Sequence, residues 1–286
     1  MRVVIQEIRM IFLDFKMNFF TKRVFVLLVL YYVLSHIFLM PLRDLSESME
    51  YPVAPWTPVF LLSDMYFLLI FICGCIYYFS NTPFFTYEQI YRILRLGKVR
   101  WGIHKLAGIL LGAVCLVASV WLVTECILLS CTEWDMGWGK LLYTLSLTDL
   151  ADGIDFFVSY DVIKTYLPVQ ALGRCFGIGV LVIALLGNSM FAASLYFSRT
   201  AALAAASAEA ATVIMYENMY RFPQMIYVSP VSWMRTDKML SLYQNAMPVL
   251  SVQEMAVVLV SANLVCAALI LYKVRYIDFS NTVKRM

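Results

Sequence analysis

The sequence predicts an all-α integral membrane protein with six transmembrane helices, and three observations lead to this prediction. The first is composition: 62% of the 286 residues are hydrophobic and 14% are charged, with a mean hydropathy of +0.77. Soluble domains are about 45–50% apolar and about a quarter charged, so this chain has too little polar surface to cover a water-soluble core. The second observation is a series of long apolar runs, and the third is the placement of cations between them. We expect residues 1–286 to form a single transmembrane domain.

Residues 1–22 predict an amphipathic helix that lies in the membrane interface. Apolar residues recur there at helical spacing: Val4, Ile8, Ile11, Phe15 and Phe19. Cations recur every seven residues on another face: Arg2, Arg9 and Lys16. An interfacial helix places such an apolar side toward the acyl chains and its cations toward water. An ordinary amphipathic cytoplasmic helix would show a similar pattern.

Apolar runs then predict the transmembrane helices, each of which needs about 20 mostly apolar residues. Five segments meet this requirement, at residues 24–40, 59–79, 106–130, 176–197 and 255–272. A further segment at 200–216 is weaker, since it is rich in alanine and carries Glu209 near its middle. Small residues let helix backbones approach closely inside a membrane. We therefore expect this segment to be buried among neighbouring helices rather than to face lipid.

The placement of Lys and Arg favours six transmembrane helices over five, because short cytoplasmic loops are enriched in these residues. With six helices and a cytoplasmic amino terminus, 15 of the 22 cations are cytoplasmic, in residues 1–23, 80–105, 198–199 and 273–286. With five helices, the four cations after residue 272 would lie outside. We expect a multi-pass protein of the cell membrane with both termini in the cytoplasm.

Two long loops are expected on the outer side, at residues 131–174 and 217–253. The first carries Trp134, Trp138, Leu141 and Leu145 at helical spacing. Because tryptophan prefers the headgroup level, this pattern predicts a helix on the outer membrane surface. Prolines in the second loop prevent it from forming one continuous helix.

The chain contains no recognisable pattern for covalent chemistry or for a cofactor. It has no GxxxxGK[ST] phosphate loop, no GxSxG elbow and no HExxH motif, and only two histidines. The seven cysteines lie mostly in or beside apolar runs, where we expect them to pack as small hydrophobes; Cys131 and Cys175 are the one pair that could form a disulfide. The net charge of +3 does not suggest a nucleic-acid partner. We expect no enzymatic activity, and any energy input must come from another polypeptide.

Two carboxyl side chains fall inside predicted transmembrane helices. An ionisable residue at the centre of such a helix costs about 2.5–3.5 kcal/mol on insertion scales and is a functional candidate by default. Glu125 lies toward the outer end of the third predicted helix, and Glu209 lies deeper in the fifth. Both are candidates for a translocation path, and structural hydrogen bonding is the alternative.

Residues 82–104, between the second and third predicted transmembrane helices, have a distinct pattern. The sequence Ser-Asn-Thr-Pro at 80–83 interrupts the chain, and residues 88–95 then predict a short helix in which Glu88 and Arg92 form an i,i+4 pair. Gly97 ends this helix just before the third transmembrane helix. Membrane insertion alone explains most of the cations in this segment. A cytoplasmic helix joined to two transmembrane helices could also transmit force from a soluble partner.

This layout resembles the permease subunits of type-2, exporter-like ATP-binding-cassette (ABC) transporters. Those subunits have an amphipathic amino-terminal helix, six transmembrane helices and a cytoplasmic coupling helix between the second and third. A basic RxGxRxxW-like segment commonly precedes their third helix, and here residues 95–101 read RLGKVRW. YVSPVSWM at 227–234 and the ending YKVRYIDF at 272–279 also resemble segments of the family.

The resemblance implies partners and sites for this chain. The coupling contact with an ATPase subunit would involve Glu88, Arg92, Arg95, Lys98 and Arg100. ATP and Mg²⁺ would bind to that separate subunit, and a second permease subunit, identical or related, would complete the pathway in the lipid bilayer. A secondary transporter, a membrane-embedded enzyme and a non-transporting sensor or assembly subunit are the alternatives.

Overall fold

A computed structural model describes residues 2–81, 89–148, 154–218, 225–237, 243–244, 247–248 and 250–276. The elements are α1 (Arg2–Phe19), α2 (Lys22–Met49), α3 (Pro58–Leu61), α4 (Met65–Phe79), α5 (Gln89–Leu96), α6 (Lys98–Leu128), α7 (Gly139–Leu147), α8 (Tyr160–Thr165), α9 (Pro168–Tyr196), α10 (Arg199–Asn218), α11 (Met225–Val228), the 3-10 helix η2 (Pro230–Met234), β1 (Tyr243–Gln244), β2 (Met247–Pro248) and α13 (Val252–Tyr276). The strands form one short antiparallel ladder in which Tyr243 pairs with Pro248. The protein is therefore all-α apart from this ladder.

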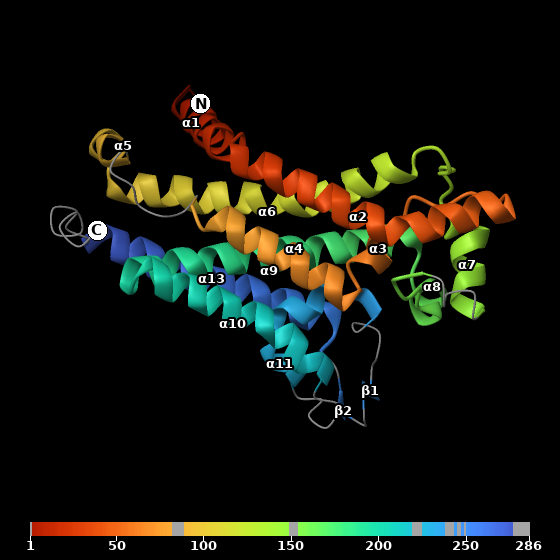
Figure 1. The fold of residues 1–286 in the computed structure, drawn as a ribbon. Coiled ribbons are helices and arrows are strands. Elements are labelled where there is room, and N and C mark those ends of the chain that lie inside the picture. Colours follow the sequence, from red (N-terminus) through yellow and green to blue (C-terminus); the bar gives the residue numbers. More distant parts are fainter. Residues whose placement is uncertain are drawn as a thin grey trace.

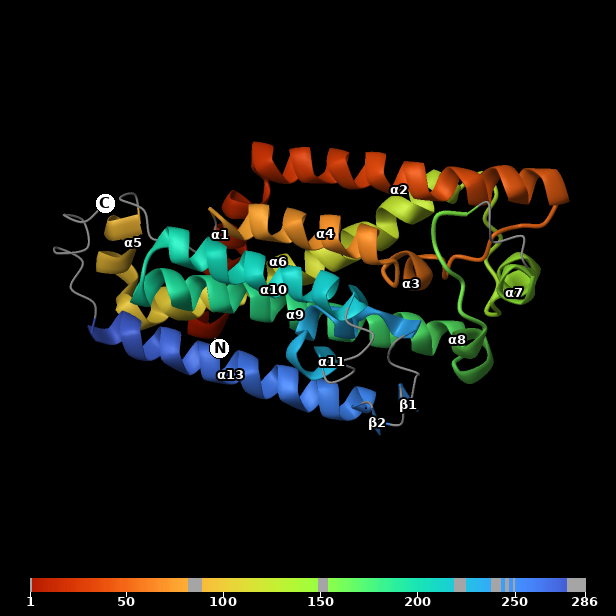
Figure 2. The same ribbon diagram turned by 60° about the horizontal axis from the view of Figure 1, so that its bottom comes forward.

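Helices α2, α4, α6, α9, α10 and α13 run along a common bundle and alternate in direction (Figure 1). The carboxyl end of α13 and the α5–α6 corner lie at one end of the bundle, whereas α7 and α8 lie at the other (Figures 1 and 2). Helix α9 is central, because it contacts α4, α6, α10 and α13. Four of these helices, α2, α6, α9 and α13, are long and apolar enough to cross a membrane. This composition is that of a membrane protein.

Several helices extend beyond the apolar runs that predicted them. Helix α2 continues from the predicted 24–40 to Met49, through Pro41, and α9 begins at Pro168 rather than at residue 176. With 28 residues, α2 is about 42 Å long, compared with a hydrocarbon thickness of about 30 Å. An apolar run ends where the chain leaves the hydrocarbon region, but the hydrogen bonding of the helix backbone continues into the polar region. Hydropathy therefore underestimated the lengths of these helices.

The predicted transmembrane helix at 59–79 is interrupted, which corrects the expectation of one continuous helix. Its first residues form α3, and α4 begins only at Met65. Asp64 is the N-cap of α4, since its carboxylate accepts a hydrogen bond from the Phe67 amide at 2.8 Å. A capping carboxylate starts a new helix because it satisfies amides that have no partner in the first turn. The uninterrupted part, α4, has 15 residues.

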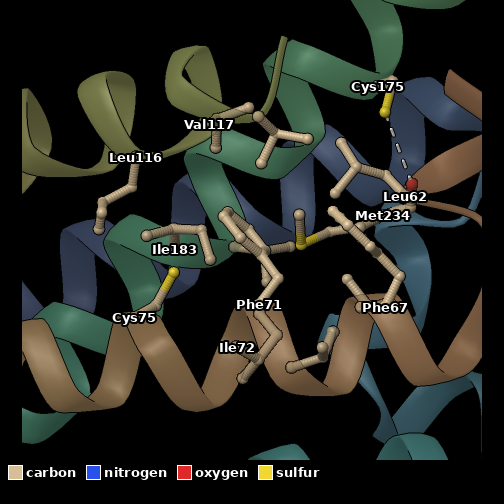
Figure 3. Close-up of a cluster of buried hydrophobic side chains, with 14 of the residues drawn as sticks. Leu62, Phe67, Phe71, Ile72, Cys75, Leu116, Val117, Cys175, Ile183 and Met234 are labelled. Carbon is tan, nitrogen blue, oxygen red and sulfur yellow. Dashed lines mark hydrogen bonds between the residues drawn. The ribbon is translucent and has the colours of Figure 1, made fainter. Parts of the chain in front are cut away.

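The core between α4, α6 and α9 is a layer of interlocking apolar side chains (Figure 3). Phe67 and Phe71 of α4 point toward Ile183 of α9 and toward Met234 of η2 in this layer. All four side chains are completely buried. Because η2 contributes Met234 to this layer, the segment before α13 is packed into the bundle rather than lying loosely outside it.

Helix α10 has two faces made of small residues. Ala202, Ala206 and Ala210 are buried, and the helix contacts α9 and α4. The opposite face is exposed within this chain and contains Ala204, Ser207, Ala208 and Ala211. The expectation that residues 200–216 pack among neighbouring helices therefore holds for one face only.

The first of the two segments predicted as long outer loops contains helices. Residues 131–174 include α7 and α8, but α7 begins at Gly139 and leaves Trp134 exposed outside it. The helix begins later than predicted because Trp138 occupies its N-cap position and Gly139 has a positive φ of 71°. Trp138, Leu141 and Leu145 are buried against the rest of the protein, so α7 is packed into the fold instead of resting only on a membrane surface.

Candidate functional site

Helix α5 forms a corner between α4 and α6. Its Ile93 side chain is buried, whereas Tyr91 and Leu94 are 77% and 76% exposed, and Arg95 is also exposed. The helix thus uses one side for attachment and leaves a mixed aromatic, aliphatic and cationic side open. Glu88 lies outside the described residues, as does the side chain of Arg92, so the expected Glu88–Arg92 pair remains a prediction.

Gly97 makes the turn between α5 and α6. Its φ of 83° and ψ of 152° lie in a region that is essentially restricted to glycine. The Gly97 amide donates to the Ile93 carbonyl at 2.8 Å, and its own carbonyl accepts from the Trp101 amide at 3.1 Å. One residue therefore ends one helix and begins the next without a flexible linker.

The start of α6 is fixed firmly in the bundle. Trp101 is 2% exposed, and its ring lies 5.9 Å from that of Phe191 of α9 in an edge-to-face arrangement. One residue further, a Cβ atom on Gly102 would lie 3.2 Å from Leu271 of α13, so these two helices are in close contact. The start of α6 is therefore packed against both α9 and α13.

A charged cluster joins α1 to the same part of α6, and we call these four residues, Glu7, Asp14, Arg100 and His104, the α1–α6 clasp. His104 Nε2 lies 3.1 Å from Glu7 Oε2, and His104 Nδ1 lies 3.7 Å from Asp14 Oδ2. Arg100 Nη1 lies 3.6 Å from Glu7 Oε1. The His104 side chain is only 4% exposed, whereas that of Arg100 is 66% exposed.

Sequence reasoning missed this clasp and assigned Arg100 only to the coupling contact. Spacing could have revealed it: Glu7 and Asp14 are seven residues apart on one helix, and Arg100 and His104 are four apart on another. Both intervals place side chains on a single helical face. Lys98, the remaining predicted coupling residue, is exposed in the first turn of α6.

The segment YVSPVSWM forms α11 and η2 at the far end of the bundle. Trp233 is buried and donates from Nε1 to the Ile226 carbonyl at 2.6 Å. Buried Arg235 follows, with Nη1 2.8 Å from Glu217 Oε1 and Nη2 3.5 Å from Asp237 Oδ2. These contacts hold the segment against the end of α10. The ion pair between Arg235 and Glu217 had no counterpart in the sequence-based predictions.

The two predicted path carboxyls lie on different helices and at different depths. Glu125 is half-buried near the outer end of α6, and its Oε1 is buried without a hydrogen-bond partner among the described residues. Glu209 lies near the middle of α10, where its carboxyl contacts the Ser189 side chain of α9. The structure does not bring these two carboxyls into one site.

Cys131 and Cys175 do not form a disulfide, and all seven cysteines are free. The Cys131 thiol donates to the Leu128 carbonyl at 3.3 Å, and burial raises its pKa. Cys175 is buried, with its sulfur 3.9 Å from the Met234 carbonyl oxygen (Figure 3). The expectation that these cysteines serve in packing is confirmed for this pair. Within the part of the chain that is described, no group of three His, Cys, Asp or Glu side chains is placed to hold a metal ion.

The fold and these sites define a multi-helix membrane protein whose short, exposed helix α5 is rigidly joined to the bundle. Comparison with protein-family models, with characterised proteins and with solved structures gave no match.

Proposed function

We propose that this chain is the membrane-spanning permease subunit of an ATP-driven exporter of the type-2 ABC class. ATP and Mg²⁺ bind to separate ATPase subunits, and this chain carries out no covalent chemistry. Its task is to convert the movement of those subunits into a rearrangement of the transmembrane bundle. The observation that carries the proposal is α5, a short exposed helix that is joined through Gly97 to a tightly packed transmembrane helix.

The arrangement of the bundle supports six membrane crossings. Helices α2, α4, α6, α9, α10 and α13 alternate in direction, so α5 lies at the same end as the carboxyl end of α13 (Figure 1). Cations are concentrated in the segments at that end, which supports a cytoplasmic location for it. Helix α4 is short but apolar, and α10 packs one face against α9 and α4; we propose that both also cross the membrane as members of the bundle.

Helix α1 provides the contact with the cytoplasmic membrane surface. Four of its large apolar side chains are exposed, Ile8, Phe12, Leu13 and Met17, whereas Phe15 of the predicted apolar stripe is buried in the protein. Arg9 and Lys16 are exposed as well, and the acidic residues of the clasp face α6 instead. Arg9 and Lys16 lie on the helix surface between these apolar side chains, because Leu13 follows Arg9 and Lys16 follows Phe12 by four residues. We propose that this mixed face lies at the headgroup level, where the apolar side chains insert and the cations attract anionic lipids.

A second permease subunit packs against the exposed small-residue face of α10. Inside a membrane, small residues favour close helix–helix contact, whereas lipid-facing positions are usually occupied by larger apolar side chains. Two such faces brought together would place the two copies of α10 beside the translocation path. Glu209, as an ionisable residue of α10, is then a candidate group beside that path, whereas Glu125 of α6 is a candidate at the outer end of the bundle.

The ATPase partnership is tested by co-expressing the chain with an ATPase subunit encoded near it, where the genome has one, and purifying the complex. Photo-crosslinkers are placed at Tyr91, Leu94 and Arg95, and at Lys140 on the opposite end of the bundle as the matched control. We expect the α5 positions to crosslink to the ATPase and Lys140 to remain uncrosslinked. Recovery of no ATPase, or crosslinks from Lys140 but none from α5, would contradict the proposal.

A further inference from the structure

The segment between α6 and α7 exposes three large apolar side chains, and we call residues 129–136 the outer turn. Leu129, Trp134 and Met136 are 70%, 67% and 79% exposed. Exposed apolar side chains that gather in one place mark a surface that contacts another molecule or a membrane. The outer turn is therefore a candidate contact surface, separate from α1 and α5.

Hydrogen bonds hold the outer turn in a fixed position. The Val53 amide donates to the Cys131 carbonyl at 2.9 Å, and the Glu133 amide donates to the Val53 carbonyl at 3.1 Å. Trp56 donates from Nε1 to the Asp135 carbonyl at 3.1 Å. Both parts of the turn are thus joined to the segment that follows α2, so the exposure of its apolar side chains belongs to an ordered arrangement.

Trp134 lies at the tip of the outer turn. The Asp135 amide donates to the Glu133 carbonyl at 3.0 Å, a bond between residues two apart that makes Trp134 the central residue of a three-residue turn. The Asp135 carboxylate is directed toward Gly137, where a Cβ atom would lie 3.1 Å from its Oδ2. The tip of the turn is consequently an indole ring.

The length of α6 places the outer turn at the surface of a bilayer. Exposed large apolar side chains occur from one end of this helix to the other: Ile103, Leu110, Leu122 and Leu129. At 1.5 Å per residue, Ile103 and Leu129 are about 39 Å apart along the helix. A bilayer with its headgroups is about 40–45 Å thick. If Ile103 lies at the headgroup level on one side, Leu129 lies at that level on the other, at the end of the bundle where α7 is found (Figure 1).

We propose that the outer turn inserts Trp134 and Met136 into the outer leaflet, at the boundary between headgroups and acyl chains. Tryptophan favours this level because its ring is apolar and its N–H group requires a polar partner. The turn contains two acidic residues and no Lys or Arg, so its partner is a zwitterionic lipid such as phosphatidylcholine. This contact requires that α6 crosses the membrane, and it does not depend on an ATPase partner.

Water and a second protein chain are the two other environments that could surround Trp134. An indole ring in water is open to a small aqueous quencher of fluorescence and is remote from the acyl chains. A ring that packs against a second copy of this chain is shielded from both lipid and water. The three environments therefore differ in which quencher reaches Trp134.

The test measures the fluorescence of Trp134 in the full chain in phosphatidylcholine nanodiscs. Subtraction of the emission of Trp134→Phe from that of the wild-type chain isolates Trp134 from the other tryptophans, and the exposed position tolerates phenylalanine. Nanodiscs with brominated acyl chains are compared with unbrominated ones, and acrylamide is titrated into the aqueous phase in parallel. We expect brominated lipid to remove most of the Trp134 signal and acrylamide to remove little of it.

Trp138 provides the matched control, because it lies four residues away and is buried, with Nε1 donating to the Tyr166 carbonyl at 2.9 Å. Its signal, isolated in the same way with Trp138→Phe, should not respond to brominated lipid. Met136→Asp places a charge beside the tip and should shift the Trp134 signal from quenching by lipid to quenching by acrylamide. Replacement of part of the lipid with brominated phosphatidylglycerol should not increase the quenched fraction.

Three outcomes would overturn the proposal. Quenching of Trp134 by acrylamide but not by brominated lipid would place the turn in water. A signal that neither quencher reaches would place the turn against another protein chain. A larger quenched fraction with phosphatidylglycerol would identify an anionic lipid as the partner. Because these samples contain no ATPase, each outcome leaves the proposed coupling role of α5 to its own crosslinking test.

Discussion

Loss of the Glu7 carboxylate should release α1 from the bundle through His104 rather than through Arg100. Glu7 contacts both residues, at 3.1 Å from His104 Nε2 and 3.6 Å from Arg100 Nη1. The Arg100 side chain is largely exposed, and exposed ion pairs contribute about 0–1 kcal/mol. The His104 side chain is almost completely buried, so removal of its partner leaves a buried polar group unsatisfied, which costs about 1–3 kcal/mol.

Hydrogen exchange of the α1 backbone amides measures this difference directly. A loss of about 1–3 kcal/mol in the local opening free energy corresponds to exchange that is about 5- to 150-fold faster in Glu7→Leu, which offers His104 no hydrogen-bonding group. Arg100→Gln is the matched control and should accelerate exchange no more than about fivefold. A double-mutant cycle should therefore give a larger coupling energy for Glu7 with His104 than for Glu7 with Arg100.

Two results would refute this reasoning. Unchanged exchange of α1 in Glu7→Leu would mean that apolar packing alone holds the helix. Equal coupling energies for the two pairs would mean that burial of His104 does not determine the strength of the clasp.

Three further predictions concern the turn, the core and the far end of the bundle. Gly97→Ala should destabilise the fold by about 1–3 kcal/mol, because alanine disfavours the positive φ of this turn; no atom lies near the added Cβ, so crowding makes no contribution. Gly108→Ala, in a helical conformation and equally uncrowded, is the control and should be neutral or stabilising in the same thermal unfolding assay. Gly187→Ala should cost about 1–3 kcal/mol through overpacking, since its Cβ would lie 2.6 Å from Ile109 and 2.9 Å from Phe79, whereas Gly177→Ala has no such neighbour and serves as its control. Arg235→Met should destabilise the fold by about 3 kcal/mol, because the part-buried Glu217 carboxylate loses its ion pair with Arg235. The double variant Arg235→Met/Glu217→Gln should recover part of this loss. An unchanged Tm in Arg235→Met would show that the ion pair does not hold η2.

The helical elements followed from local sequence patterns because a membrane restricts the available structures. A chain segment in lipid must satisfy its backbone hydrogen bonds internally, so an apolar run of sufficient length becomes a helix. Apolar runs therefore located α2, α6, α9 and α13, and alanine content located α10. Boundaries were less accurate, since a helix such as α2 continues into the polar region, and Asp64 interrupts an apolar run by capping α4.

The candidate sites were only partly accessible to sequence reasoning, because each depends on residues that are far apart in the chain. Gly97 marked the end of α5 through its conformational preference, and it does occupy a positive-φ turn. Glu209 attracted attention as a carboxyl within an apolar segment. Neither observation indicates which residues lie opposite, and the partners of Glu209 and Asn188 come from α9 and α13.

Composition, hydropathy and glycine placement determined that this protein is a bundle of apolar helices with a short helix between the second and third of its long apolar segments. These properties depend on one residue and its near neighbours in the chain. Tertiary structure alone decided that His104 is buried between Glu7 and Asp14, that Arg235 pairs with Glu217, and that Asn188 of α9 donates to Asn263 of α13. Such contacts depend on which helix faces come together, and that is determined by close packing across the whole bundle.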